Sequence, residues 1–475
     1  MKNYDLIVIG TGSAMNLVSP ILQQNPSMKV AVIDKDEPGG ICLTRGCIPT
    51  KILLYPAELI RVIEHAKQLG ISLEIDDVNF TEIMARMRSL IDEDIENIRE
   101  GLSRSEDIDY YPTVAEFSAP YELKVGEEII TSKFIFLCTG SKPIIPPIKG
   151  LEKIGYHTSD NILHIKKLPK SLIIIGGGYI AAEYGHFFSA MGSKVTIIGR
   201  NPQFLPQEEP EVSELAKREL SKYMQIFTNH EAVESNLKDN LKEITSRNRD
   251  NGNLVKFTAE EVLIAAGRGS NNDILHPEKA GIETDEKGWI KVNEYLESSQ
   301  PNVWVFGDAN GKHLFKHVGN YESMVVFYNA VLKNKVKVDY HAIPSAVFTY
   351  PEIARVGLRE KEAIVEYGED NIIIGYQKYE DTAKGMAMDV KAYFVKVILD
   401  KERKILGAHI IGPQASVLIQ EIITLMYTPE RSSYPINRGM HIHPALSEVV
   451  ERAFGRLMRP RDYHALLEEV TRHHH

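Results

Sequence analysis

Short runs of β-branched residues that end at glycine are the dominant pattern of the chain. Residues 4–15, YDLIVIGTGSAM, predict a buried strand, a glycine-rich turn and the start of a helix, and residues 170–183, KSLIIIGGGYIAAE, repeat this order. A second apolar run follows each of them, at residues 29–34 (KVAVID) and 193–200 (SKVTIIGR). We therefore predict two strand–turn–helix–strand units of the kind that bind dinucleotides.

The first unit offers most of the positions that a dinucleotide needs. Gly10 and Gly12 let the backbone approach a pyrophosphate, and the following helix offers free N–H groups. Met15 takes the third glycine position, so we expect a local displacement of the helix from the strand. Asp34 ends the second strand, where its carboxylate can accept hydrogen bonds from a ribose; the alternative is an ordinary aspartate at a strand end.

The second unit differs in the residue that ends its second strand. It has Gly176, Gly178 and Ala181 at the glycine positions, and its second strand ends in Arg200 without an acid. An acid there favours the free ribose hydroxyl of NAD, whereas an arginine accommodates the additional phosphate of NADP. The pattern favours NADPH without excluding NADH, and the alternative is that Arg200 is a solvated surface residue.

Length and composition indicate a globular protein of several domains. At 475 residues, with 43% hydrophobic and 25% charged residues, the chain predicts about three domains. The net charge of −10 argues against nucleic acid or an anionic membrane as a partner. We expect no membrane span, no signal peptide and a cytoplasmic location, because the chain starts directly as a strand and has no long apolar run. Residues 473–475, all His, resemble a tag remnant.

Two of the three cysteines lie in residues 39–51, GGICLTRGCIPTK. Residues five apart in a regular helix have Cα atoms about 9 Å apart, whereas a disulfide needs less than about 7 Å. A bond between Cys42 and Cys47 therefore requires a break in any helix there, for which Gly46 gives freedom, while Pro49 suits the first turn of the amphipathic helix that follows. A redox pair, two unrelated buried thiols and a metal site are the alternatives. Cys138 offers no matching pair of ligands, so we expect no metal.

The segment GGICLTRGCIPTK, residues 39–51, resembles the active-site signature of the class I pyridine nucleotide–disulfide oxidoreductases. This family includes dihydrolipoamide dehydrogenase, glutathione reductase and mycothione reductase. Nearly the whole chain shares the resemblance. Further segments similar to motifs of the family follow in the same order, namely FLCTGSKP (136–143), LIAAGRGSN (263–271), NVWVFGDANG (302–311), IPSAVFTYPEIARVG (343–357), ILGAHIIGPQAS (405–416) and HIHPALSEVVERAF (441–454).

The resemblance implies an α/β fold with two Rossmann-like domains, one for FAD and one for NAD(P), and a C-terminal α+β dimerisation domain. The expected FAD-binding domain has two parts, residues 1–148 and 273–339. The NAD(P)-binding domain is expected at residues 149–272 and the dimerisation domain at 340–472. The family further implies a homodimer with twofold symmetry.

The resemblance also implies roles for single residues. Cys47 faces the flavin, Cys42 exchanges with the substrate, and Lys51 lies near the reactive flavin nitrogen. Lys51 is expected to pair with Glu183, and Tyr179 matches the tyrosine that gates the nicotinamide pocket. The expected cofactor-binding residues are Gly10, Gly12, Ser13, Asp34, Lys35, Gly40, Thr139, Gly140, Gly176, Gly178, Tyr179, Arg200, Gly267, Arg268, Gly307 and Asp308.

The last motif is expected to supply the acid–base group, His443, oriented by Glu448. Thiol–disulfide exchange needs a deprotonated attacking thiol and a protonated leaving thiol, and a histidine can serve both near neutral pH. Pro444 suits the first position of a helix and holds His443 extended. We expect His443 and Glu448 to serve the cysteine pair of the other subunit. His441 is the less favoured base, and a structural role or a metal pair is the alternative for both histidines.

The resemblance favours a dihydrolipoamide dehydrogenase-like enzyme that acts on a lipoyl or small disulfide substrate, with a 2-oxoacid dehydrogenase complex as a further possible partner. An NADPH-dependent mycothione or glutathione reductase is the alternative, although Pro206 stands where a second phosphate-binding arginine is expected. Arg45 replaces a small apolar residue, and its charge can lower a thiol pKa or recognise an acidic substrate. A non-catalytic flavoprotein subunit is the alternative of another class.

Overall fold

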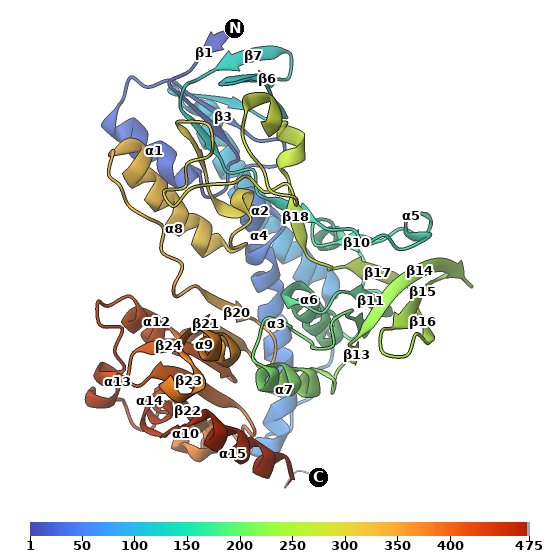
Figure 1. Cartoon of the computed structure of the whole chain (residues 1–475). Coiled ribbons are helices and arrows are strands. Elements are labelled where there is room, and N and C mark those ends of the chain that lie inside the picture. Colours follow the sequence, from blue (N-terminus) through green and yellow to red (C-terminus); the bar gives the residue numbers. More distant parts are fainter. Residues whose placement is uncertain (473–475) are drawn as a thin grey trace.

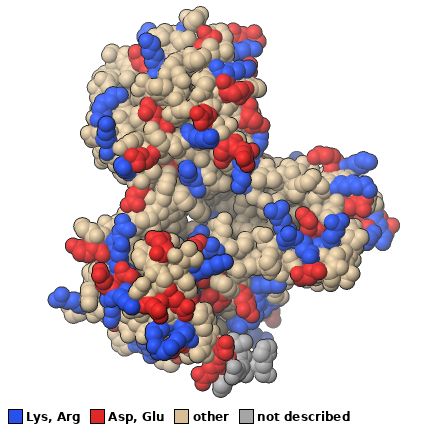
Figure 2. All heavy atoms as spheres, in the orientation of Figure 1, with Lys and Arg blue, Asp and Glu red and all other residues tan. Residues whose placement is uncertain are grey.

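The computed structural model describes residues 1–472 and arranges them as three lobes around a long helix, α3 (Cys47–Ala66) (Figure 1). The possible tag remnant at residues 473–475 lies outside the described residues. Acidic and basic side chains are interspersed on the face of the three lobes that Figure 2 shows. Within residues 1–472, no helix combines the length and the apolar character that crossing a membrane requires.

The first lobe is built on a five-stranded parallel sheet of order β19-β8-β2-β3-β4. Its central strands are buried along their whole length, as parallel strands covered on both faces require. The strands are β2 (Leu6–Ile9), β3 (Val30–Ile33), β4 (Ile108–Tyr111), β8 (Ile135–Leu137) and β19 (Val303–Val305). Around them lie α1 (Met15–Gln24), α2 (Gly40–Thr44), α4 (Phe80–Arg104), α8 (Lys316–Val326) and a small sheet of β1 (Lys2–Asn3), β5 (Ala115–Ala119), β6 (Glu122–Val125) and β7 (Glu128–Thr131).

The second lobe repeats this architecture with a parallel sheet of order β10-β17-β11-β12-β13. The two predicted strand–turn–helix–strand units are therefore confirmed, one in each lobe. The strands are β10 (His157–Thr158), β11 (Ser171–Ile175), β12 (Lys194–Ile198), β13 (Gln225–Phe227) and β17 (Glu261–Ile264). The remaining elements are α6 (Tyr179–Ala190), α7 (Pro210–Leu220) and an antiparallel sheet of β14 (His230–Lys238), β15 (Leu241–Asn248) and β16 (Leu254–Ala259).

The third lobe, formed by the C-terminal part of the chain, is a six-stranded antiparallel sheet with helices around it. Its order is β20-β21-β24-β23-β22-β25, with β20 (Pro344–Val347), β21 (Ile353–Gly357), β22 (Ile372–Lys378), β23 (Phe394–Asp400), β24 (Ile405–Ile411) and β25 (Leu457–Met458). The main helices are α9 (Glu360–Tyr367), α12 (Gln420–Met426), α13 (Tyr434–Arg438), α14 (Ser447–Gly455) and α15 (Pro460–Arg472). The chain thus has the mixed α/β fold that the sequence predicts.

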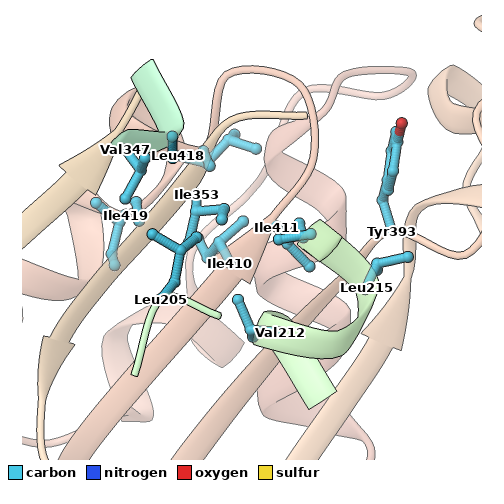
Figure 3. Packing of buried hydrophobic residues seen from close by; sticks show 14 of the residues in the cluster. Leu205, Val212, Leu215, Val347, Ile353, Tyr393, Ile410, Ile411, Leu418 and Ile419 are labelled. Atoms are coloured by element: carbon cyan, nitrogen blue, oxygen red, sulfur yellow. The ribbon is translucent and has the colours of Figure 1, made fainter. Parts of the chain in front are cut away.

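One buried apolar cluster joins the second lobe to the third. Figure 3 shows Leu205 and Val212, which flank the start of α7, beside Ile353 and Ile410 on β21 and β24. All four side chains are almost completely removed from solvent. Because apolar burial stabilises a contact by about 25 cal/mol per Å², this cluster fixes the segment before α7 against the third lobe.

Candidate functional site

A cavity of about 810 Å³ lies where the three lobes meet. Its volume is within the range of cofactor and ligand sites, about 300–1,000 Å³. Parts of the chain that are far apart in sequence meet in its wall, from the turn after β2 to the third lobe. The predicted site residues that line it are Gly10, Gly12, Ser13, Asp34, Lys35, Gly40, Cys42, Cys47, Lys51, Thr139, Gly140, Tyr179, Glu183, Arg268, Gly307 and Asp308.

The turn after β2 has the shape that close approach of a dinucleotide requires. Gly10 has φ +103°, and a Cβ there would lie 2.1 Å from a backbone carbonyl oxygen, that of Cys138. No side chain caps the N-terminus of α1, and within residues 1–472 the N–H groups of Gly12 and Ser13 in the turn before it make no hydrogen bond, which leaves them available to an anion. Asp34 accepts hydrogen bonds from the N–H and the hydroxyl of Thr11, at 2.8 and 2.6 Å. Met15 begins α1 and lines a separate cavity of about 670 Å³ between α1 and α4.

Cys42 and Cys47 form a disulfide in the wall of the main cavity, the one of about 810 Å³, with Cα atoms 4.9 Å apart. The predicted break in the helix is present, because α2 ends at Thr44 and α3 begins at Cys47. Pro49 lies in the first turn of α3, as predicted. The bond leaves neither sulfur as a thiolate ligand for a metal. Cys138 is the free cysteine, and burial raises the pKa of its thiol to about 12.

Arg45, between the two cysteines, joins the first lobe to the second through carboxylates. Its guanidinium lies 2.5 Å from Asp36 and 3.5 Å from Asp160, and its side chain is 19% exposed. Asp160 also lies 3.8 Å from Arg268. Burial raises the pKa of Asp36, but its contacts with Lys35 and Arg45 outweigh this effect and lower it. The charge of Arg45 is therefore already balanced by carboxylates within the site, which argues against recognition of an acidic substrate.

Lys51 and Glu183 form the predicted ion pair across the cavity wall. Lys51 Nζ lies 2.7 Å from Glu183 Oε2, and the two side chains are 34% and 11% exposed. The other carboxylate oxygen accepts the N–H of Phe348 at 3.1 Å, and the ammonium lies 4.6 Å from the centre of that phenyl ring. Residues from all three lobes thus fix the position of the Lys51 ammonium. Lys51 stands four residues after Cys47, on the same face of α3.

A chain of hydrogen bonds holds Asp308, in the predicted motif of residues 302–311. Ser141 donates to Asp308, and Arg268 donates to the hydroxyl oxygen of Ser141 at 2.7 Å. Burial raises the pKa of Asp308. Glu322 accepts the N–H of Gly307 at 2.6 Å, and burial raises the pKa of Glu322 to about 7. Sequence reasoning missed Glu322, although an acid at helical spacing from the apolar residues Val318 and Val326 is the signal that points to it.

The remaining residues that were predicted to bind nucleotide lie at the carboxyl edge of the second sheet, outside the main cavity. Gly176 has φ +141°, and a Cβ there would lie 2.0 Å from the carbonyl oxygen of Ala265. Gly178 precedes α6 without a side-chain cap, as an anion site at a helix N-terminus requires. Gly267 and the exposed Arg200 follow β17 and β12 at the same edge, where ligands of parallel sheets bind.

His443 and Glu448 also lie outside the cavity. His443 Nδ1 is 2.9 Å from Glu448 Oε1, and this hydrogen bond lowers the pKa of Glu448. The side chain of His443 is 67% exposed. Figure 1 places α13 and α14, which flank it, at the outer side of the third lobe and away from α2. A single chain therefore does not bring the predicted base to the disulfide.

The start of α14 differs from the sequence prediction. The helix begins at Ser447, so the prediction that Pro444 opens it is wrong. The carboxylate of Glu448 accepts the N–H of Ala445 at 3.3 Å, which satisfies the backbone at the turn and lets the helix start later. His441, the less favoured base, lies 3.2 Å from Glu421 of α12.

Two further residues of the site, Glu208 and Arg355, were not predicted. Glu208 lies between β12 and α7, and Arg355 lies on β21. Glu208 stands in a polar stretch without a motif, whereas Arg355 lies in the segment 343–357, whose resemblance to the family implied no role for it. Their meeting beside Tyr179 depends on the packing of two lobes, for which the sequence offers no signal.

Comparisons with known proteins agree with this geometry. The family model described as pyridine nucleotide-disulphide oxidoreductase matches residues 4–331, and the model of its dimerisation domain matches residues 343–454. Mycothione reductase of Mycobacterium tuberculosis is 35% identical and the match covers 95% of this chain and 99% of that protein. Dihydrolipoyl dehydrogenase of Chlamydia trachomatis is 33% identical, with 94% and 95% covered. The solved HOCl-induced flavoprotein disulfide reductase of Escherichia coli superposes with a TM-score of 0.83 and 26% identity, with 95% and 99% covered.

Proposed function

Because the chain belongs to the pyridine nucleotide-disulphide oxidoreductase family, we propose that it transfers two electrons between a nicotinamide nucleotide and a dithiol/disulfide substrate of the dihydrolipoyl type. It is a flavoprotein disulfide reductase whose redox centre is Cys42–Cys47. One observation carries the proposal: the disulfide lies in the same cavity as the glycine turn after β2 and the Lys51–Glu183 pair. We also propose three domains: an FAD-binding domain of residues 1–148 and 273–339, an NAD(P)-binding domain of residues 149–272, and a dimerisation domain of residues 340–472.

The residues of the cavity fit FAD. The free N–H groups of Gly12 and Ser13 would hold its pyrophosphate, Asp34 its ribose and Asp308 its ribityl chain. When bound, FAD supplies a carrier that takes hydride from the nicotinamide and passes two electrons to a disulfide. Lys51 would hold a positive charge beside the reactive ring, where Glu183 fixes its position.

The two cysteines and His443 account for the S–S bonds that form and break in the exchange with the substrate. In the reduced protein, the Cys42 thiolate attacks one sulfur of the substrate disulfide, and the first substrate thiol leaves with a proton from His443. The Cys47 thiolate then attacks the Cys42 sulfur, re-forms the Cys42–Cys47 bond and releases the second thiol. One nucleotide hydride and one proton are consumed for each disulfide that becomes two thiols. The dihydrolipoyl dehydrogenase direction is the reverse of these steps.

This scheme requires a homodimer, which the dimerisation domain supports. Because His443 is exposed and remote from the cavity in one chain, we propose that it reaches the cysteine pair of the second subunit. The test mixes an inactive Cys42→Ser chain with an inactive His443→Ala chain, refolds them together and assays turnover. Shared sites predict partial recovery, because each heterodimer holds one complete site. Heterodimers without activity would contradict the proposal.

A reductase of a small disulfide is the second candidate for the substrate. Mycothione reductase matches at 35% identity, and Arg200 leaves the edge of the nucleotide site positively charged. The experiment offers lipoamide, mycothione and glutathione disulfide to the protein in turn with each nucleotide. The proposal expects lipoamide to give the highest kcat/KM, and a preference for mycothione of tenfold or more would decide for the second candidate.

The nucleotide preference rests on Arg200. We propose that NADPH has a lower KM than NADH, because an exposed guanidinium at the end of β12 can bind the ribose phosphate. A hydrogen bond to a charged group contributes about 1.5–3 kcal/mol, which predicts about a tenfold or larger change. Arg200→Glu is expected to reverse the preference, with Lys238→Glu at the exposed end of β14 as the control. A wild-type protein that prefers NADH tenfold would contradict this proposal.

A further inference from the structure

Tyr179 stands where the three lobes meet, and each lobe contributes a contact to its side chain. It is the first residue of α6 and lines the cavity that holds the disulfide. Its ring stacks on that of Phe315, before α8, with 6.5 Å between ring centres. Its hydroxyl donates a hydrogen bond to Glu208 Oε1 at 2.9 Å. Burial raises the pKa of Tyr179 to about 12, so the hydroxyl keeps its proton and remains a donor.

Glu208 is a buried carboxylate whose ion-pair partner is Arg355, while Arg359 is a second positive charge near it. The Glu208 side chain is 1% exposed, and Arg355 Nε of β21 lies 3.4 Å from the oxygen that Tyr179 also contacts. Burial raises the pKa of Glu208, and the charge of Arg355 acts against this effect. A buried charge is costly without a partner, so Glu208 and Arg355 hold each other in place. The second carboxylate oxygen of Glu208 has no hydrogen-bond partner within residues 1–472.

The segment that carries Glu208 is anchored and cannot follow a moving tyrosine. Leu205 and Val212 on either side of it pack against β21 and β24 (Figure 3). Glu209 accepts the N–H of Glu360 at 2.5 Å, which ties the segment to α9. Glu208, which Arg355 holds, is therefore a fixed acceptor, whereas the side chain of Tyr179 can turn about its own bonds.

We propose that Glu208 and Arg355 are positioning residues that hold Tyr179 in a closed state over the nicotinamide position. This inference rests on the proposed function and on the family resemblance, which assigns Tyr179 to the nicotinamide pocket. Nucleotide binding then has to break the Tyr179–Glu208 hydrogen bond, and the Glu208–Arg355 pair persists when the tyrosine turns away. Because only the open fraction of molecules binds nucleotide, the closed state raises the apparent dissociation constant by the reciprocal of that fraction.

Two variants remove the same hydrogen bond from opposite sides. Tyr179→Phe deletes the hydroxyl and leaves the ring and the Glu208–Arg355 pair, whereas Glu208→Met with Arg355→Met deletes the acceptor and leaves no buried charge of this pair behind. The expected result is a nucleotide dissociation constant about tenfold lower in both variants, as loss of one hydrogen bond to a charged group implies. Tyr156→Phe is the control, because it removes a tyrosine–glutamate hydrogen bond, to Glu152, remote from the cavity.

The measurements are calorimetric titration with NADP⁺ and NAD⁺, and anaerobic flavin reduction at increasing NADPH or NADH. The inference expects a tighter nucleotide dissociation constant and a lower KM for the nucleotide in both variants, because the tyrosine no longer has to leave the carboxylate before the nucleotide binds. Unchanged or weaker nucleotide binding in Tyr179→Phe would overturn it, and this variant decides if the double variant does not fold. If neither nucleotide reduces the wild-type flavin, the proposed function fails instead, whatever the titrations show.

Discussion

Glu183→Gln tests how the cavity sets the redox balance of the cysteine pair. The substituted amide would keep an acceptor for the Phe348 N–H and would remove one negative charge 2.7 Å from Lys51. Lys51 stands four residues after Cys47 on α3, which puts the Cβ atoms of these two residues about 6 Å apart. The Glu183 charge is then about 8 Å from a Cys47 thiolate, and at an effective dielectric constant of about 20–40 it repels that thiolate by about 1–2 kcal/mol.

Removal of this repulsion favours the reduced protein. For a two-electron couple about 1.4 kcal/mol corresponds to about 30 mV, so the disulfide potential is expected to rise by about 20–45 mV. The assay equilibrates the FAD-loaded protein with dithiol buffers of known potential and follows the thiols by alkylation. Glu64→Gln is the matched control, because Glu64 lies on α3, the helix that carries Cys47 and Lys51, and forms an ion pair with Arg61 at 2.9 Å outside the cavity. A potential that is unchanged within about 10 mV, or that falls, would refute this account of the Lys51–Glu183 pair.

Three further variants test separate parts of the site. Gly10→Ala puts a Cβ 2.1 Å from a carbonyl oxygen, so the purified protein is expected to lose FAD absorbance, whereas Gly70→Ala, which has φ +83° and no atom within 4 Å, is expected to keep it. Burial raises the pKa of Glu322 to about 7, so the stability that its protonated carboxyl contributes is lost as the pH rises from about 4.5 to 7. The Tm of Glu322→Gln should therefore fall less over this pH range than the Tm of the wild type. Parallel curves of Tm against pH would contradict this assignment. Glu448→Gln should lower disulfide turnover about tenfold or more and leave flavin reduction by nucleotide unchanged, whereas equal loss in both half-reactions would contradict a role limited to His443.

The sequence predicted those parts of the structure that depend on local pattern. The glycines at 10 and 176 require a positive φ and a close approach of the backbone, and such positions stand out at the end of a β-branched run. The break between α2 and α3 followed from the reach of a disulfide across five residues. Lys51 and Glu183 came only with the family resemblance, because no local pattern relates two residues so far apart in the chain.

The parts that could not be predicted depend on packing between lobes. Arg45 has two carboxylate partners, one from each of two lobes, and the sequence alone allowed other roles for its charge. Glu208 meets Arg355 only because Leu205 and Val212 pack on the third lobe. Such contacts arise from long-range burial, which leaves no periodicity around either residue.

A count of cysteine thiols before and after reduction by nucleotide tests the redox assignment most directly. The FAD-loaded protein is treated anaerobically with NADPH or NADH, alkylated in denaturant and examined by mass spectrometry. The disulfide leaves one thiol, Cys138, in the oxidised protein, and the account predicts that nucleotide makes all three cysteines available. Cys42→Ser, the control, should show Cys47 and Cys138 alkylated before and after nucleotide. A flavin that is bleached while Cys42 and Cys47 stay bonded would contradict the account.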